Sequence, residues 1–202
     1  MPHTPAKITG ASALCALLMA VGQPAHAEEA IATFAGGCFW SLEAAFDKLP
    51  GVIETTTGYT GGTDDSPTYE RVAAGTTEHR EAVQVRYDAD TLDYPTLLIA
   101  YWHSINPVDR LGQFCDVGPS YTTAIYTHTP EQRRLAEESR TFLEQRKFGR
   151  PLATEIHDAT RFYPAEAAHQ DFVRRHPETY ARYRRQCGTD LGLAAIWGVS
   201  GK

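Results

Sequence analysis

Residues 28–51, EEAIATFAGGCFWSLEAAFDKLPG, predict how the fold begins. The stretch from Glu28 to Ala35 reads as a short strand that stops at Gly36-Gly37. Apolar residues then recur at helical spacing until Pro50-Gly51 breaks the pattern; they are Phe39, Leu42, Phe46 and Leu49. The segment therefore predicts a strand, a glycine turn and a helix, with Cys38 at the first turn of that helix.

Strands and helices alternate along the rest of the chain. Thr129 and Gln132 form a capping box, with Pro130 at the first helical position, so a long helix starts there and ends near residues 147–149. The order of elements favours an α/β (α+β) fold built on a ferredoxin-like plait. The other expected strands cover residues 52–59, 81–87, 121–128 and 152–157, and the other helices cover 94–104 and 165–184, the last interrupted at Pro177.

The composition is that of one packed globular domain. The chain has 202 residues, of which 42% are hydrophobic and 22% are charged, with a formal net charge of −6. It has no basic block, so neither nucleic acid nor an anionic membrane is an expected partner.

The first 27 residues predict a secretory signal peptide. One cation, Lys7, precedes an apolar stretch, and Ala25-His26-Ala27 matches an A-x-A cleavage site. The apolar run is shorter than the roughly 20 residues that a membrane span needs, which disfavours an uncleaved anchor. We therefore expect a signal peptide over 1–27, one globular domain over 28–202, and an exported, periplasmic protein without a membrane anchor.

Cleavage would remove Cys15 and leave three cysteines, Cys38, Cys115 and Cys187. An odd number in a compartment that permits disulfides leaves at least one thiol outside an internal bridge. Free backbone N–H groups and the helix dipole at the expected helix start would lower the pKa of Cys38 and make it a nucleophile. The alternative is a buried cysteine that behaves as a small hydrophobe.

An acid stands out in the strand expected at 81–87. Strict alternation places Glu81 on the same face as Val83, Val85 and Tyr87. Burial there would raise the carboxyl pKa and keep the group protonated near neutrality, so that it could donate a proton. The alternative is a residue at the strand end that escapes to solvent.

Several motifs in the same order resemble the A-type peptide methionine sulfoxide reductases over about 150 residues. They begin with Gly-Cys-Phe-Trp at Cys38. The other segments are Gly58-Tyr59-Thr60-Gly61-Gly62, Pro67 to Val72, His79 to Val83, Asp116 to Tyr121, and Phe162 to Glu166 followed by His169-Gln170. The resemblance implies a two-layer sandwich around a plait-like mixed sheet and a substrate that is the S-epimer of methionine sulfoxide, free or in oxidised proteins. It implies no metal and no organic cofactor.

The resemblance also implies roles for individual residues. Glu81 matches the acid that protonates the sulfoxide oxygen, and Tyr69 and Tyr121 match the tyrosines that hydrogen-bond it. Asp116 matches a second carboxylate, while Phe39 and Trp40 match the apolar cup for the substrate methyl group. Taken alone, the tyrosines could be core residues and Asp116 could cap a turn beside Gly118-Pro119.

A thiol reductase needs a route back to its reduced state. Attack of Cys38 on the sulfoxide would give a sulfenic acid, which a second cysteine converts to a disulfide for a thioredoxin-like donor to reduce. Cys187, between cations and Gly188, is the first choice as resolving cysteine. Cys115 is the alternative, either as resolver or in a relay with Cys187. We expect a monomer.

Two other classes of function stay open from the residues alone. A thiol hydrolase would need a base histidine and an oxyanion site, and the chain has eight histidines. A non-catalytic secreted binding module would account for aromatic pockets, but it would not account for an acid on an apolar face and a cysteine at a helix start.

Overall fold

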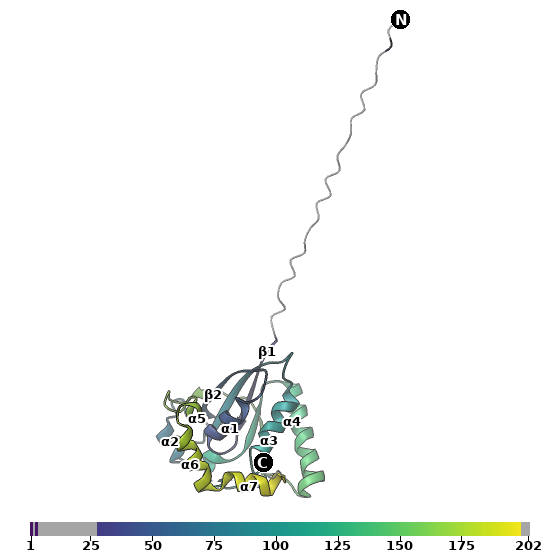
Figure 1. The fold of residues 1–202 in the computed structure, drawn as a ribbon. Coiled ribbons are helices and arrows are strands. Elements are labelled where there is room, and N and C mark those ends of the chain that lie inside the picture. The colour runs from purple at the N-terminus through teal and green to yellow at the C-terminus, as the bar shows by residue number, and fades with distance from the viewer. Residues whose placement is uncertain (2, 4–27, 199–202) are drawn as a thin grey trace.

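The computed structural model describes Met1, His3 and residues 28–198 of the chain (Figure 1). The expected signal peptide over residues 1–27 lies outside the described residues, apart from Met1 and His3.

A mixed six-stranded sheet forms the centre of the molecule, with strand order β7-β6-β1-β3-β2-β8. Its inner four strands, β6-β1-β3-β2, are antiparallel and have the order of a ferredoxin-like plait, while β7 pairs parallel to β6. The prediction of a plait core with a mixed sheet is therefore confirmed. The strands are β1 (Glu29–Ala35), β2 (Val52–Thr60), β3 (Arg80–Asp88), β6 (Ala124–Thr127), β7 (Glu155–Asp158) and β8 (Tyr163–Pro164).

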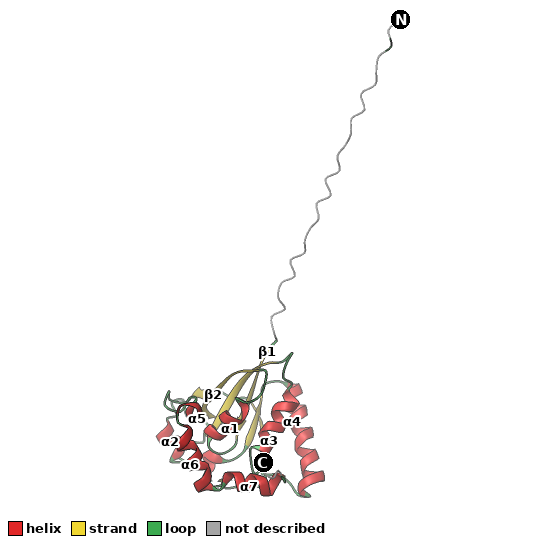
Figure 2. Cartoon of the chain, in the orientation of Figure 1, coloured by secondary structure: helices red, strands yellow, loops and turns green. Residues whose placement is uncertain are grey.

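Helices pack against this sheet and against each other as a second layer (Figure 2). Helix α1 (Phe39–Phe46) packs on β2 and β3, while α3 (Tyr94–His103) lies between α1 and α4 (Pro130–Leu143). Figure 1 shows α6 (Pro177–Cys187) and α7 (Thr189–Trp197) in yellow, wrapping one end of the two layers. Within the part of the chain that the structure describes, no helix combines the length and the apolar character needed to cross a membrane.

Aromatic side chains fill the space between sheet and helices. The Phe34 ring stacks on Tyr101 and Phe46, with centroids 4.9 and 5.1 Å apart. The buried Tyr101 hydroxyl donates to the carbonyl oxygens of Ala35 and Ala124, at 2.9 and 3.3 Å. These bonds tie α3 to the ends of β1 and β6, next to the turn that carries Cys38.

The expected helix over residues 165–184 is wrong for its first part. Residues 165–171 form turns, followed by α5 (Phe172–Arg175) and then α6. The Gln170 side chain bonds the backbone of Thr57 in both directions, and Asp171 has a positive φ of 52°. Tertiary hydrogen bonds from this segment to β2 replace the helical pattern.

Several short elements have no periodicity long enough to be predicted from the sequence. The strand expected at 121–128 is shorter, and a 3-10 turn, η1 (Pro119–Tyr121), precedes it. The remaining unpredicted elements are α2 (Tyr69–Ala73), the hairpin of β4 (Gly112–Gln113) and β5 (Asp116–Val117), a π turn η2 (Glu144–Phe148) that ends α4, the edge strand β8, and α7.

Candidate active site

Two glycines set the turn that presents Cys38. A Cβ at Gly36 would lie 2.6 Å from Ile105 Cγ2, and one at Gly37, whose φ is +78°, would lie 2.6 Å from Gln113 Cβ. Gln113 is buried and bonds the backbone of Asn106 through both ends of its amide. The turn is therefore packed too closely for any side chain, and it brings the β4–β5 hairpin against the nucleophile.

Glu81 lies buried beside that turn, with 2% of its surface exposed. Its Oε2 accepts a hydrogen bond of 3.0 Å from the backbone N–H of Phe39, at the start of α1. Burial raises the carboxyl pKa to about 8, although this hydrogen bond opposes the shift. The residue is a protonated acid at neutral pH, as its place on the apolar face of β3 predicted.

The surroundings of Cys38 differ from the expectation of an activated thiolate. Burial raises the pKa of the Cys38 thiol well above its usual value, and the charges of Glu81 and Asp116 raise it further. The backbone N–H of Trp40 and the hydroxyl of Tyr183 favour the thiolate but do not outweigh these effects. The expected lowering by the helix start is wrong for this state, because burial of the thiol and the charges of two acids outweigh the N–H groups at the start of α1.

Tyr69, Tyr121 and Asp116 converge on the same sulfur from three separate elements. Burial, followed by the charges of Glu81 and then of other site groups, raises the pKa of both tyrosine hydroxyls. Burial also raises the pKa of Asp116, against the hydrogen bonds of the Tyr183 hydroxyl and the Cys38 backbone N–H. The fold thus gathers hydroxyl donors and two carboxyl groups around one thiol.

The segment after β8 fixes one of these tyrosines. Glu166 accepts from the backbone N–H of Tyr69 at 2.9 Å and from the hydroxyl of Tyr59 at 2.7 Å. It thereby satisfies the first turn of α2 and links that helix to β2.

An aromatic wall lies beside Cys38. The Trp40 indole stacks face to face on Phe172, with centroids 3.7 Å apart and planes inclined by 5°. The His169 ring packs between Trp40 and Tyr69. Buried Glu43 in α1 accepts from the backbone N–H groups of Asp171 and Phe172, at 3.0 and 3.3 Å, so it holds the segment that supplies the wall.

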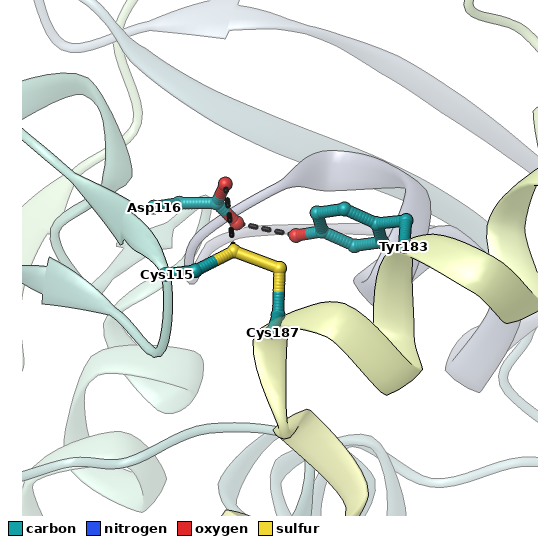
Figure 3. Close-up of a disulfide and its surroundings, with 4 residues drawn as sticks. All are labelled: Cys115, Asp116, Tyr183 and Cys187. Atoms are coloured by element: carbon teal, nitrogen blue, oxygen red, sulfur yellow. Dashed lines mark hydrogen bonds between the residues drawn. A yellow bond between two sulfur atoms is a disulfide. The ribbon is translucent and has the colours of Figure 1, made fainter.

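The two remaining cysteines of the domain are bonded to each other. Cys115, at the tip of the β4–β5 hairpin, forms a disulfide with Cys187, the last residue of α6, while Cys38 is free (Figure 3). One helical turn before Cys187, the Tyr183 hydroxyl donates to Asp116 Oδ2. The structure therefore brings Cys115, Asp116, Tyr183 and Cys187 together at the edge of the site.

The sequence prediction missed three of the residues that build the site. Tyr183 could have been found, because it lies four residues before Cys187 and so shares a face of the expected helix. Glu166 stands in the motif from Phe162 to Glu166, but no local pattern assigned it a role, and Glu43 gave no signal. The bonds of both residues go to groups more than 90 residues away in the chain.

The alternative of a thiol hydrolase lacks its base. Among the described residues, the groups that act on the Cys38 thiol are Glu81, Asp116, Tyr183 and the Trp40 backbone, and none is a histidine. Residues 1, 3 and 28–198 also contain no cluster of three or more ligand side chains able to hold a metal ion. A cavity of about 1050 Å³ on the face of β3 to which Arg80 points includes none of the predicted site residues in its lining.

Comparison with known proteins agrees with the geometry. Residues 30–198 match the family model described as peptide methionine sulfoxide reductase. A protein of that name from Bacillus licheniformis is 50% identical over 169 residues, which cover 83% of this chain and 93% of that protein. One from Bacillus pumilus is 50% identical over 171 residues, covering 84% and 96%.

The fold has a counterpart among solved structures. Methionine sulfoxide reductase A of Corynebacterium diphtheriae superposes with a TM-score of 0.66 at 30% sequence identity. The match covers 77% of each chain.

Glu81→Gln should lower the pKa of Cys38, because Glu81 ionises first and its charge then opposes the thiolate. The measurement is the pH dependence of iodoacetamide alkylation, with the Cys115–Cys187 disulfide intact. Glu78→Gln, an exposed acid near the start of β3, is the control and should leave the profile unchanged. An unshifted profile in Glu81→Gln would show that this carboxyl does not act on the thiol.

Proposed function

The chain belongs to the peptide methionine sulfoxide reductase family and reduces methionine sulfoxide at the expense of thiols, and we propose how its residues do so. Cys38 is the nucleophile, Glu81 the proton donor, and the S-epimer of free or protein-bound methionine sulfoxide the substrate. The observation that carries the proposal is a free thiol beside a carboxyl group that is buried and protonated at neutral pH.

The first step transfers the sulfoxide oxygen to Cys38. The S–O bond of the substrate breaks and an S–O bond forms at the Cys38 sulfur, so methionine is released and Cys38 becomes a sulfenic acid. A sulfoxide oxygen gains basicity as this bond breaks. The proton on Glu81 and the hydroxyls of Tyr69 and Tyr121 are placed to stabilise it.

The raised pKa of Cys38 fits this order of events. A neutral thiol and a neutral acid can share a buried site that two anions could not. Trp40, with Phe172 stacked on it, offers an apolar surface for the substrate methyl group, whereas Phe39, the other residue expected there, is fully buried behind it in the core.

The second stage consumes the sulfenic acid. Cys187 attacks Cys38, water leaves, and a Cys38–Cys187 disulfide forms. Cys187 is the better first resolver because it shares a face of α6 with Tyr183, whose hydroxyl lowers the pKa of the nearby Cys38 thiol. Cys115 then attacks Cys187 and restores the Cys38 thiol, which ends at the pairing found in the structure.

A thioredoxin-like dithiol completes the cycle in this proposal. Cys115 is exposed at the hairpin tip, so the final disulfide is open to a protein donor while Cys38 is only partly accessible. The enzyme is proposed to act as a monomer.

Replacement of the nucleophile tests the reaction. Cys38→Ser should lower reduction of free methionine S-sulfoxide with dithiothreitol by about 10³-fold or more, because a hydroxyl cannot replace the thiol in the oxygen transfer. The R-epimer should be a poor substrate for the unaltered enzyme. Appreciable turnover by Cys38→Ser would contradict the assignment, and circular dichroism would show that the variant is folded.

The order of the two resolving cysteines is tested by their serine variants. Cys187→Ser should release one equivalent of methionine and then fail to turn over with thioredoxin, with dithiothreitol restoring part of the activity. Cys115→Ser should stop at a Cys38–Cys187 disulfide. If Cys187→Ser instead accumulates a Cys38–Cys115 disulfide, then Cys115 is the first resolver.

We also propose that the enzyme acts after export, in the periplasm. The support is the sequence of residues 1–27, with its short basic start, apolar stretch and Ala25-His26-Ala27. The expected result of N-terminal sequencing of the mature protein is a chain that begins at Glu28. A mature protein that retains Met1 would refute export by cleavage.

A further inference from the structure

Asp116 lies near the sulfur atoms of Cys115 and Cys38. Both change their protonation when the Cys38–Cys187 disulfide is exchanged for the Cys115–Cys187 disulfide. Its Oδ1 is 3.9 Å from the Cys115 sulfur, and its Oδ2 accepts the hydrogen bond of the Tyr183 hydroxyl (Figure 3). The same Tyr183 hydroxyl lies near enough to the Cys38 thiol to lower its pKa. One carboxylate and one hydroxyl thus connect the attacking and the leaving thiol.

We propose that Asp116 and Tyr183 are catalytic residues of the disulfide exchange, with Asp116 as the base for Cys115 and Tyr183 as the hydrogen-bond donor to the leaving Cys38 thiolate. This inference rests on the proposed function, since it concerns the step that follows reduction of the substrate. Tyr183 thereby has a chemical role, and Asp116 has one in addition to that of the second carboxylate beside Cys38.

The exchange conserves protons, charge and the number of disulfide bonds. The Cys115 thiol gives its proton to Asp116, its sulfur bonds to Cys187, the Cys38–Cys187 bond breaks, and Cys38 leaves as a thiolate. One negative charge moves from the carboxylate to the Cys38 sulfur, and no further oxidant or reductant is needed. Tyr183 donates to Asp116 while Asp116 carries the charge, and it can donate to Cys38 once the charge has moved.

The position of Tyr183 on α6 brings its hydroxyl to Cys38 at the stage when Cys187 is bonded to Cys38. Tyr183 and Cys187 lie one turn apart on the same face of the helix, so a Cys38–Cys187 bond draws the Tyr183 hydroxyl to the nucleophile. Trp40 packs edge-on against the Tyr183 ring, at a centroid distance of 6.2 Å, and keeps it over the site. In the exchange product, with Cys115 and Cys187 joined, the Tyr183 hydroxyl still lowers the pKa of the Cys38 thiol.

Burial makes Asp116 a stronger base than an exposed aspartate, since it raises the carboxyl pKa. Several ionisable groups face Asp116 and share its electrostatic environment. They are Cys38, Cys115, Glu81, Tyr69, Tyr121 and Tyr183.

The test is a single turnover of fully reduced Tyr183→Phe with one equivalent of methionine S-sulfoxide, quenched by acid and alkylation at successive times. Methionine release should stay within about twofold of the unaltered enzyme. Formation of the Cys115–Cys187 disulfide should slow about tenfold or more, the effect of a lost hydrogen bond to a charged group, and the Cys38–Cys187 disulfide should accumulate. Tyr180→Phe, one turn earlier on α6 with its hydroxyl on Ser41 and Arg184, should leave both rates unchanged.

The species that accumulates separates a chemical role from a structural one. If Tyr183 only positions α6, Cys187 will reach Cys38 slowly and the sulfenic acid will accumulate, which dimedone labelling would detect. Accumulation of the sulfenic acid would overturn the inference. So would a Cys38–Cys115 disulfide that accumulates, loss of the methionine burst in Tyr183→Phe, or formation of the Cys115–Cys187 disulfide at the unaltered rate. Absence of the methionine burst in the unaltered enzyme would instead refute the proposed function.

Discussion

The hydrogen bond from the Phe39 N–H to buried Glu81 is the contact on which the rest of the site depends. It joins the first residue of α1 to the start of β3, and it requires that β1 end where it does, with Ala35 opposite Ala82. At the glycine turn, Gly36 and Gly37 are packed so closely against neighbouring side chains that a Cβ atom at either position would clash. Because this bond is made inside the protein, it holds a carboxyl group beside Cys38 where water would otherwise keep the acid ionised.

The electrostatics of the site keep the Glu81 carboxyl and the Cys38 thiol neutral at rest. Glu81, Asp116 and the site tyrosines all have raised pKa values, and burial is the leading cause for each. A site that held a permanent thiolate would have to ionise next to those acids. The protein instead keeps protons available for the moment when oxygen leaves the substrate, which is the step that needs them.

The long-range order of the fold could be predicted from sequence, because the strand and helix periodicities of its main elements are strong. Burial of Glu81 followed from alternation in one strand, and the start of α4 followed from Thr129, whose hydroxyl accepts from the Gln132 N–H at 3.1 Å. The segment 165–171 was mispredicted because its bonds reach across the molecule to β2 and α1. No local pattern encodes such partners. The sign of the Cys38 pKa shift depends likewise on burial, and then on acids distant in the chain, neither of which a helix-start argument includes.

The central claim is that the substrate oxidises Cys38 and that the final disulfide joins the other two cysteines, Cys115 and Cys187. Reduced enzyme should be mixed with one equivalent of methionine S-sulfoxide, alkylated at completion, and mapped by peptide mass spectrometry. The account predicts one methionine per enzyme, a Cys115–Cys187 disulfide and a Cys38 that carries the alkyl group. Methionine formed while Cys115 and Cys187 both remain alkylatable would contradict it.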